Sequence, residues 1–254
     1  MTGQRAIIRK EFREILGTYK VYVIPAIFLF FGLTSPLIAK FTPELVKSLA
    51  KGVEIKIPPP TAIDAYGQFL KNLRQIGLLA VIFTSIGLVA EEKLRGTAAL
   101  MLAKPVPRWA FIAGKFLAGA ALIAVSTALA YLACLYYTTV LFGTGLFGPS
   151  AQAALLMLAY YLLILAVTLL ASTVARSVAL AGAIAVGGFI ALSILPSLHR
   201  WLALYSPGAL AGYELRLLAG GAAFADTVPA LAVTLGLTGA LVALAMFVFG
   251  RQEL

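Results

Sequence analysis

Residues 91–115 read EEKLRGTAALMLAKPVPRWAFIAGK, a charged and proline-punctuated stretch between two long apolar runs. Residues 76–90 before it carry no charged side chain, and the run after it continues from Phe111 to about Val140 with Lys115 as its one charge. Apolar runs of this length predict membrane-spanning helices. A charged loop at a membrane face must contact something polar, and the mixture of charge, glycine and proline indicates another protein.

The composition predicts an all-α integral membrane protein. Of 254 residues, 61% are hydrophobic and 12% are charged, whereas a soluble domain is nearer one quarter charged. The chain has room for about six spans of ~20 residues, and we expect a single transmembrane domain over residues 1–254. No soluble domain is left over, so any cytoplasmic chemistry must come from another chain. The net charge of +10 is too dilute to indicate nucleic acid as a partner, and membrane lipid is the expected surrounding.

The hydrophobic pattern sets the expected elements. Residues 5–19 have the spacing of an amphipathic helix in the inner membrane interface. Residues 39–69 and 199–227 are expected to be outer loops, the second with a short helix around Tyr213–Ala219. The six spans are expected at about residues 21–38, 70–90, 111–140, 153–174, 178–195 and 228–249.

The first outer loop carries local signals of its own. Thr42 and Pro43 resemble a helix start, and residues 53–57 alternate like a short strand. Thr61 with Asp64 predicts a capping box that opens the helix leading into the second span.

Basic residues predict the orientation. They gather before the first span and in residues 91–115, and Arg176 and Arg251 follow the fourth and sixth spans. The loop at 143–152 has none, although four lysines lie among acidic residues in the first outer loop. Because cytoplasmic loops carry the excess of lysine and arginine, we expect both termini in the cytoplasm of a multi-pass cell-membrane protein.

The sequence favours no catalytic or metal site. A nucleotide-hydrolysing chain needs a glycine-rich loop ending in Gly-Lys-Ser/Thr, and here Gly114-Lys115 is followed by Phe116. Glu91 and Glu92 with Arg95 resemble a membrane metalloprotease motif, but the arginine comes one residue too early. Metal binding also needs several histidines, and His199 is the single one.

Residues 91–109 are expected to continue the second span as a polar helix and then turn. Arg95 can pair with Glu91 or Glu92 along the helix, or these charges merely solubilise its end. Gly96 is expected to break the helix. Leu94, Ala98, Met101 and Leu102 then recur on one face of a short amphipathic helix, which Pro105 and Pro107 end. Lys115 either snorkels to the interface or pairs with Glu91 or Glu92.

The segment VAEEKLRGTAALMLAKPVPRWAFIAGKFLAG resembles the signature of type-2 ABC transporter permeases. In that family a glutamate precedes Gly-Thr, a hydrophobic stretch, Pro-Val/Leu-x-Arg and Gly-Lys. Leu94 and Pro107 depart from residues that are frequent in the family. The positions that fill the signature are Glu92, Gly96, Thr97, Pro105, Arg108, Gly114 and Lys115.

The resemblance implies a permease subunit that works with a separate ATPase, which binds ATP and Mg, and with a second permease copy. It also implies that segment 91–109 is a coupling helix seated in a groove of the ATPase. The expected coupling residues are Glu91, Glu92, Arg95, Gly96, Thr97, Met101, Leu102, Pro105, Arg108 and Lys115.

Two further features bear on transport. Lys71 and Arg74, at the outer end of the second span, either contact an anionic headgroup or snorkel to lipid phosphate. Ala179, Ala183, Gly187 and Ala191 share one face of the fifth span, which indicates close helix packing within the chain or a face for a second copy.

The favoured function is an export permease for a lipid-like or amphipathic substrate, since no polar pathway lines the spans. One alternative is a scaffold or sensor subunit that does not transport. Another is an ion-coupled carrier, which is disfavoured because no ionisable residue is expected in the middle of a span.

Overall fold

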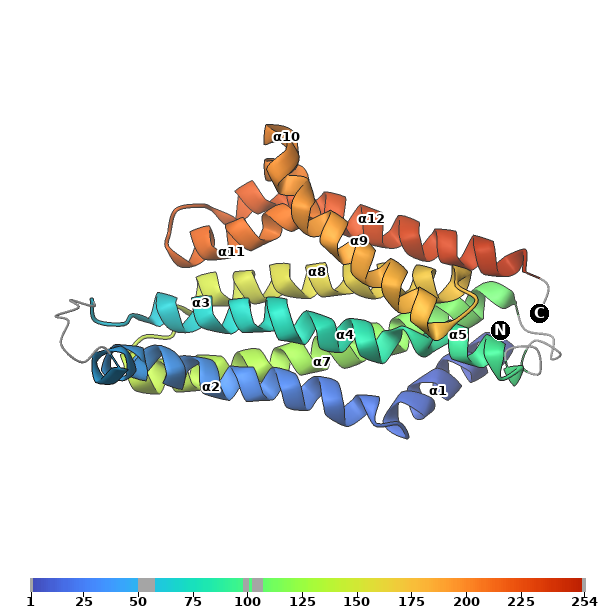
Figure 1. The fold of residues 1–254 in the computed structure, drawn as a ribbon, viewed down its shortest axis with the longest axis horizontal. Coiled ribbons are helices and arrows are strands. Elements are labelled where there is room, and N and C mark those ends of the chain that lie inside the picture. The colour runs from blue at the N-terminus through green and yellow to red at the C-terminus, as the bar shows by residue number, and fades with distance from the viewer. Residues whose placement is uncertain (1, 50–57, 98–100, 102–106, 253–254) are drawn as a thin grey trace.

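The computed structural model describes residues 2–49, 58–97, 101 and 107–252, and over these ranges its regular structure is helical, without a strand. Among them are six helices long and apolar enough to cross a membrane. The spans run side by side along the length of the molecule, and both chain termini lie at one end (Figure 1). We call this the terminal end and the opposite end the distal end. The predicted all-α membrane fold is confirmed.

Most spans are single helices that extend beyond the predicted bounds. The second is built instead from four consecutive pieces, α3 (Ala62–Asn72), the π-helix η1 (Leu73–Gly77), α4 (Leu78–Ser85) and α5 (Gly87–Leu94). The single helices are α2 (Lys20–Leu49), α7 (Arg108–Phe142), α8 (Phe147–Val174), α9 (Val178–Leu198) and α12 (Phe224–Gly250), and α1 (Thr2–Leu16) precedes them.

The predicted capping box at the start of the second span is confirmed. Thr61 accepts a hydrogen bond from the Asp64 backbone N–H, and the Asp64 carboxylate accepts one from the Thr61 N–H at 2.8 Å. A helix start closed in this way satisfies donors that would otherwise be unpaired.

The predicted helix start at Thr42 and Pro43 is wrong. Helix α2 continues unbroken to Leu49, and the Thr42 hydroxyl donates to the Ile38 carbonyl within it. Much of the expected loop at 39–69 is therefore helix, because a long apolar helix tolerates a proline whose lost hydrogen bond is a local cost. The predicted strand at 53–57 lies outside the described residues.

Helix α8 is the centre of the bundle. Tyr160 and Tyr161 are almost fully buried, and the Tyr161 ring packs against Phe28 of α2 with centroids 5.1 Å apart. Elsewhere in the bundle, the Phe111 ring of α7 stacks on the Phe249 ring of α12, with ring centroids 5.0 Å apart. The remaining spans pack around α8 and expose their outer faces, as expected where lipid or another subunit covers them.

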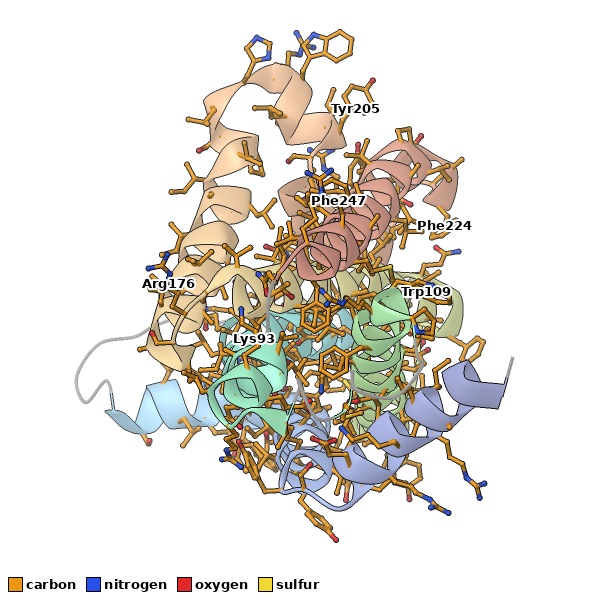
Figure 2. The ribbon with its side chains drawn as sticks, turned by 90° about the vertical axis from the view of Figure 1, so that its right-hand side faces the viewer. Lys93, Trp109, Arg176, Tyr205, Phe224 and Phe247 are labelled. Atoms are coloured by element: carbon orange, nitrogen blue, oxygen red, sulfur yellow. The ribbon has the colours of Figure 1, made fainter. Side chains whose placement is uncertain are left out.

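Helix α9 leans away from the bundle and carries α10 (Arg200–Tyr205) on its far end (Figures 1 and 2). Ala181 and Ala185 are the buried face of α9, whereas the small-residue stripe of Ala179, Ala183, Gly187 and Ala191 is exposed. The predicted packing of that stripe within the chain is therefore wrong, because a different face of α9 meets α8. After α10, η2 (Pro207–Ala209) and α11 (Leu210–Leu218) fold back onto the bundle. The short helix predicted around Tyr213–Ala219 is confirmed as α11, which begins three residues earlier.

Candidate functional site

A side chain of α8 separates α4 from α5. The Ser172 hydroxyl oxygen accepts hydrogen bonds from the backbone N–H groups of Val89 and Ala90, each at 3.0 Å. The same hydroxyl donates to the Ile86 carbonyl at 2.7 Å. In an unbroken α-helix the Ala90 N–H would bond to the Ile86 carbonyl, so Ser172 stands in place of that bond. Insertion of a side chain into the hydrogen-bond ladder is a cause of helix breaks, and α5 becomes a separate piece attached to α8.

The other end of α5 is closed by Gly96. The Arg95 N–H donates to the Glu91 carbonyl and the Gly96 N–H to the Lys93 carbonyl, at 2.9 and 3.2 Å. Gly96 has a φ of 69°, in the left-handed region that favours glycine. The predicted break at Gly96 is confirmed. Helix α5 is thus an eight-residue rod between two breaks.

Lys115 is the centre of a buried ion cluster. Its side chain is 1% exposed, and its Nζ lies 2.6 Å from Glu92 Oε1 and 3.0 Å from Glu11 Oε2. The sequence left open whether Lys115 snorkels or pairs with a carboxylate, and here it pairs with Glu92. Three elements meet at this lysine, because Glu11 belongs to α1, Glu92 to α5 and Lys115 to α7. A buried lysine requires such compensation, since an isolated charge in a low-dielectric interior is very costly.

Gly114 gives α1 the room to reach the cluster. A Cβ atom at this position would lie 3.2 Å from Glu11 Cγ and 3.4 Å from Ile7 Cγ2. Any side chain there would press on α1 at the turn that carries Glu11. The Gly114-Lys115 pair therefore combines the space for α1 with the charge that holds it.

Lys10 extends the cluster toward the surface. It forms ion pairs with Glu11 at 3.1 Å, with Glu92 at 3.5 Å and with Glu14. Burial by itself would lower the pKa of Lys10, but the Glu14 hydrogen bond and the charges of Glu11 and Glu92 outweigh it and raise that pKa. Burial would raise the pKa of Glu14, yet its hydrogen bond to Lys10 and the charge of Lys115 lower it. Lys10, Glu11, Glu14, Glu92 and Lys115 are called the Glu92–Lys115 cluster below.

The cluster chemistry fits ion pairing better than metal binding. The carboxylates of Glu11, Glu14 and Glu92 lie within 4.8 Å of one another, a spacing that a cation could bridge. Lys115 and Lys10 already bond to these carboxylates. The positive charge that such a site needs is therefore supplied by the chain itself.

Lys93 and Arg108 hold the ends of two other spans. Lys93 Nζ donates to the Thr173 carbonyl at 2.8 Å and to Gln252 Oε1 at 3.1 Å. Arg108 donates to the carbonyls of Gly250 and Gln252 at 3.2 and 2.7 Å. Cations are favourable where helices end in unsatisfied carbonyls. Figure 2 shows Lys93 and Trp109 at this terminal end, where α5 and α7 lie between α1 and α12.

A cavity of about 460 Å³ opens beside the cluster, between α1, α5 and the start of segment 91–109. Glu92 Oε2 is buried and has no hydrogen-bond partner in the described part of the chain. The other lining side chains include the charged Lys20, Glu91 and Arg95 and the uncharged Thr97 and Met101.

The predicted coupling residues are brought together only in part. Glu92 and Lys115 are in direct contact, and Glu91 lines the cavity. The predicted helical pairs of Arg95 are wrong, because Glu92 turns to Lys115 and Arg95 joins no ion pair of the described residues. Met101 packs against the core of the chain itself. Leu102 and Pro105 lie outside the described residues.

Glu11 and Ser172 were not singled out from the sequence. Glu11 stands in an N-terminal helix whose basic residues dominate the pattern, and Ser172 is one small hydroxyl in a long apolar span. A signal for Glu11 exists, because an acidic residue facing the membrane side of a basic interfacial helix needs a buried cation. For Ser172 the sequence carries no comparable signal, since a serine in a membrane helix usually bonds to its own backbone.

Arg74 has a neighbour that the sequence reading did not consider. Its Nη2 lies 2.6 Å from Glu214 Oε1 of α11, and its guanidinium lies over the Tyr160 ring, 5.1 Å from the centroid. Burial raises the pKa of the Glu214 carboxyl, an effect that the charge of Arg74 opposes. Lys71, one turn earlier, is exposed. With its contacts to Glu214 and Tyr160 in place, the Arg74 side chain is still 22% exposed, so a lipid headgroup can reach it.

Comparison with known proteins agrees with the signature in residues 91–115. The sequence profile of the ABC-2 family transporter proteins matches residues 5–254, nearly the whole chain. The chain is also 29% identical over 210 residues to a protein described as uncharacterized transmembrane protein YxlG of Bacillus subtilis (strain 168), covering 80% of this chain and 81% of that one. The chain has six helices long and apolar enough to cross a membrane, and Glu92 and Lys115 of the signature are in direct contact. This chain belongs to the ABC-2 family of transporter membrane proteins.

Proposed function

We propose that this chain is the permease subunit of an ATP-driven exporter and that segment 91–109 couples it to a separate ATPase. The observation that carries the proposal is the attachment of α5. Ser172 holds one end of this short rod to α8, and Glu92 near the other end is bonded to Lys115 of α7. Glu11 of α1 bonds to the same lysine.

This attachment suits the transmission of force. Segment 91–109 begins on α5, so a displacement of the segment by an ATPase would act on the rod and through it on α1, α7 and α8. Hydrogen-bond and salt-bridge networks and rigid secondary elements can carry coupling between distant sites. The breaks at Ile86 and Gly96 would let the rod move as one piece.

The remaining parts of the proposal follow from charge and exposure. Basic residues concentrate at the terminal end, and the excess of lysine and arginine in cytoplasmic loops favours a cytoplasmic position for that end of a cell-membrane protein. The exposed small-residue stripe on α9 offers a close-packing face to a second permease copy. ATP and Mg would bind to the ATPase, and we expect no cofactor on this chain. The apolar span surfaces favour a lipid-like or amphipathic substrate.

The proposal is tested by asking whether the chain associates with an ATPase and whether that complex hydrolyses ATP and transports a compound. The tagged chain is purified from its native membranes, and a co-purifying ATPase is assayed with lipid-like compounds for stimulated ATP hydrolysis and transport in vesicles. Stimulated, vectorial transport supports the exporter. A stable complex whose hydrolysis no compound stimulates and that moves nothing favours the scaffold or sensor alternative. Transport that persists without any ATPase and follows an ion gradient favours the carrier.

A further inference from the structure

A second cavity of about 410 Å³ lies in the distal half of the bundle, between the second span, α8, α9 and the turn into α11. Arg74 precedes Glu92 by 18 positions along the second span. At a helical rise of 1.5 Å per residue, the cavity therefore lies roughly 27 Å from the Glu92–Lys115 cluster. Its size is in the range of small-molecule sites. The lining residues are Arg74, Gln75, Leu79, Tyr160, Phe189, Ser193, Gly208 and Ala211.

The walls of this cavity change from polar to apolar in one direction. The second span runs from the distal end toward the terminal end, and there Gln75 precedes Leu79 by one turn. Helix α9 runs the opposite way, and there Ser193 follows Phe189 by one turn (Figure 1). On both helices the polar residue is nearer the distal end and the apolar residue nearer the middle of the bundle. This order matches the head and tail of a lipid in the distal leaflet.

Arg74 is the charged group of the cavity wall. Glu214 is 2% exposed and does not line the cavity, whereas Arg74 does. In the described part of the chain, Nη2 to Glu214 is the one side-chain hydrogen bond of Arg74. A guanidinium carries five N–H donors, so Glu214 and the Tyr160 ring orient Arg74 and leave donors for a ligand. Planar guanidinium groups favour phosphate and carboxylate oxygens.

The backbone at Arg74 is also unusual. Arg74 lies in the π-helical turn Leu73–Gly77, and the Tyr161 hydroxyl donates to the Leu73 carbonyl at 2.9 Å. Wide turns of this kind inside α-helices are frequent at functional sites. Here the turn is stabilised from α8, which sets the direction in which Arg74 leaves the helix.

We propose that this cavity binds the anionic head of an amphipathic lipid, with Arg74 on its phosphate and its first acyl carbons against Leu79 and Phe189. The proposal rests on the proposed function only in regarding this lipid as the transported compound. Binding itself needs neither the ATPase nor transport.

The experiment uses the full chain in lipid nanodiscs. The probe is phosphatidylglycerol with a photoreactive diazirine near the head of one acyl chain, and phosphatidylcholine with the same diazirine is the comparison. Labelled peptides are located by mass spectrometry. We expect phosphatidylglycerol to label peptides that contain Leu79 and Phe189, and phosphatidylcholine to label them about tenfold less.

Three variants test the assignment. Ser193→Phe fills the cavity and keeps every charge, and the double variant R74Q/E214Q removes both charges while keeping a polar side chain at each position. Each should reduce phosphatidylglycerol labelling about tenfold, whereas Arg200→Gln, at an exposed arginine outside the cavity, should leave it unchanged. If the double variant fails to fold, Ser193→Phe decides.

Equal labelling by the two lipids, or wild-type labelling in Ser193→Phe, would overturn the site. The outcome is separable from that of the proposed function. Specific labelling in a chain that associates with no ATPase would retain the site and reject the exporter, and the opposite pattern would retain the exporter and reject the site.

Discussion

Lys115 Nζ on α7 lies 2.6 Å from Glu92 Oε1 on α5, and both residues lie in the segment that resembles the type-2 ABC permease signature. They are 23 residues apart in the chain, and between them lies the segment proposed to meet the ATPase. The ion pair therefore closes the base of that segment. Glu11 makes α1 a third member of the same contact.

Replacing Lys115 with methionine should destabilise the protein more than any exposed lysine replacement. Glu11 and Glu92 would remain as buried carboxylates without their main counter-charge, a situation that costs about 3–5 kcal/mol when one partner of a buried pair is removed. The measurement is thermal unfolding in detergent. Lys71→Met, at an exposed position, is the control and should unfold like wild type.

Glu92→Gln should separate assembly from coupling. The substitution leaves the exposed face of segment 91–109 unchanged but weakens the bond to Lys115, so we expect a complex that hydrolyses ATP and transports less per ATP. Paired hydrolysis and transport assays measure the ratio. An unchanged ratio would show that the ion pair does not transmit force.

Asp at Leu94 and Leu102 should abolish association with the ATPase. Leu94 is 62% exposed, and both leucines belong to the face predicted to dock; burying two carboxylates there costs several kcal/mol. Asp at Met101 and Leu102 would be a less clean test, because Met101 packs against the core of this chain. A pull-down with wild-type affinity would mean that this segment is not the docking helix.

Ser172→Ala should loosen the attachment of α5 to α8. Two backbone N–H groups lose their acceptor, and unpaired buried donors cost about 1–3 kcal/mol each unless the α-helical bond from Ala90 to Ile86 re-forms. Hydrogen exchange at Val89 and Ala90 and thermal unfolding detect the change. Thr168→Val is the matched control, since the Thr168 hydroxyl donates only to Ile164 of its own helix.

The docking of α1 should weaken in acid. The pKa of Glu14 is lowered from 4.5 in the folded protein, chiefly because the Lys10 hydrogen bond outweighs the opposing burial. A lowered pKa means that the stabilisation is fully present above pH 4.5 and is lost as the pH falls through the folded value. Protease cleavage of α1 should rise in that window. In Glu14→Gln the stabilisation should already be absent at neutral pH, and Glu44→Gln should behave as wild type.

The large elements could be predicted because each depends on residues close together in the chain. Runs of apolar residues require helices in lipid, where every backbone group must bond internally, and so six spans followed from composition and order. The capping box at Thr61 and the break at Gly96 are likewise local, set by one side chain and one backbone angle. Where the local signal was weak the prediction failed: Thr42 and Pro43 look like a helix start, but the apolar helix continues through them.

The sequence by itself determined the membrane class, the number of spans and the segment that carries the family signature. Only the tertiary structure decided the partners. Glu92 has the guanidinium of Arg95 one turn away on its own helix, yet Lys115 of α7 and Lys10 of α1 reach it from two other helices. The sequence likewise left three features undetermined, namely which side of α9 is exposed, the insertion of Ser172 and the pairing of Arg74 with Glu214. The physical reason is that a buried charge or an open backbone group can be satisfied by any suitable partner, and packing of distant helices selects which one is within reach.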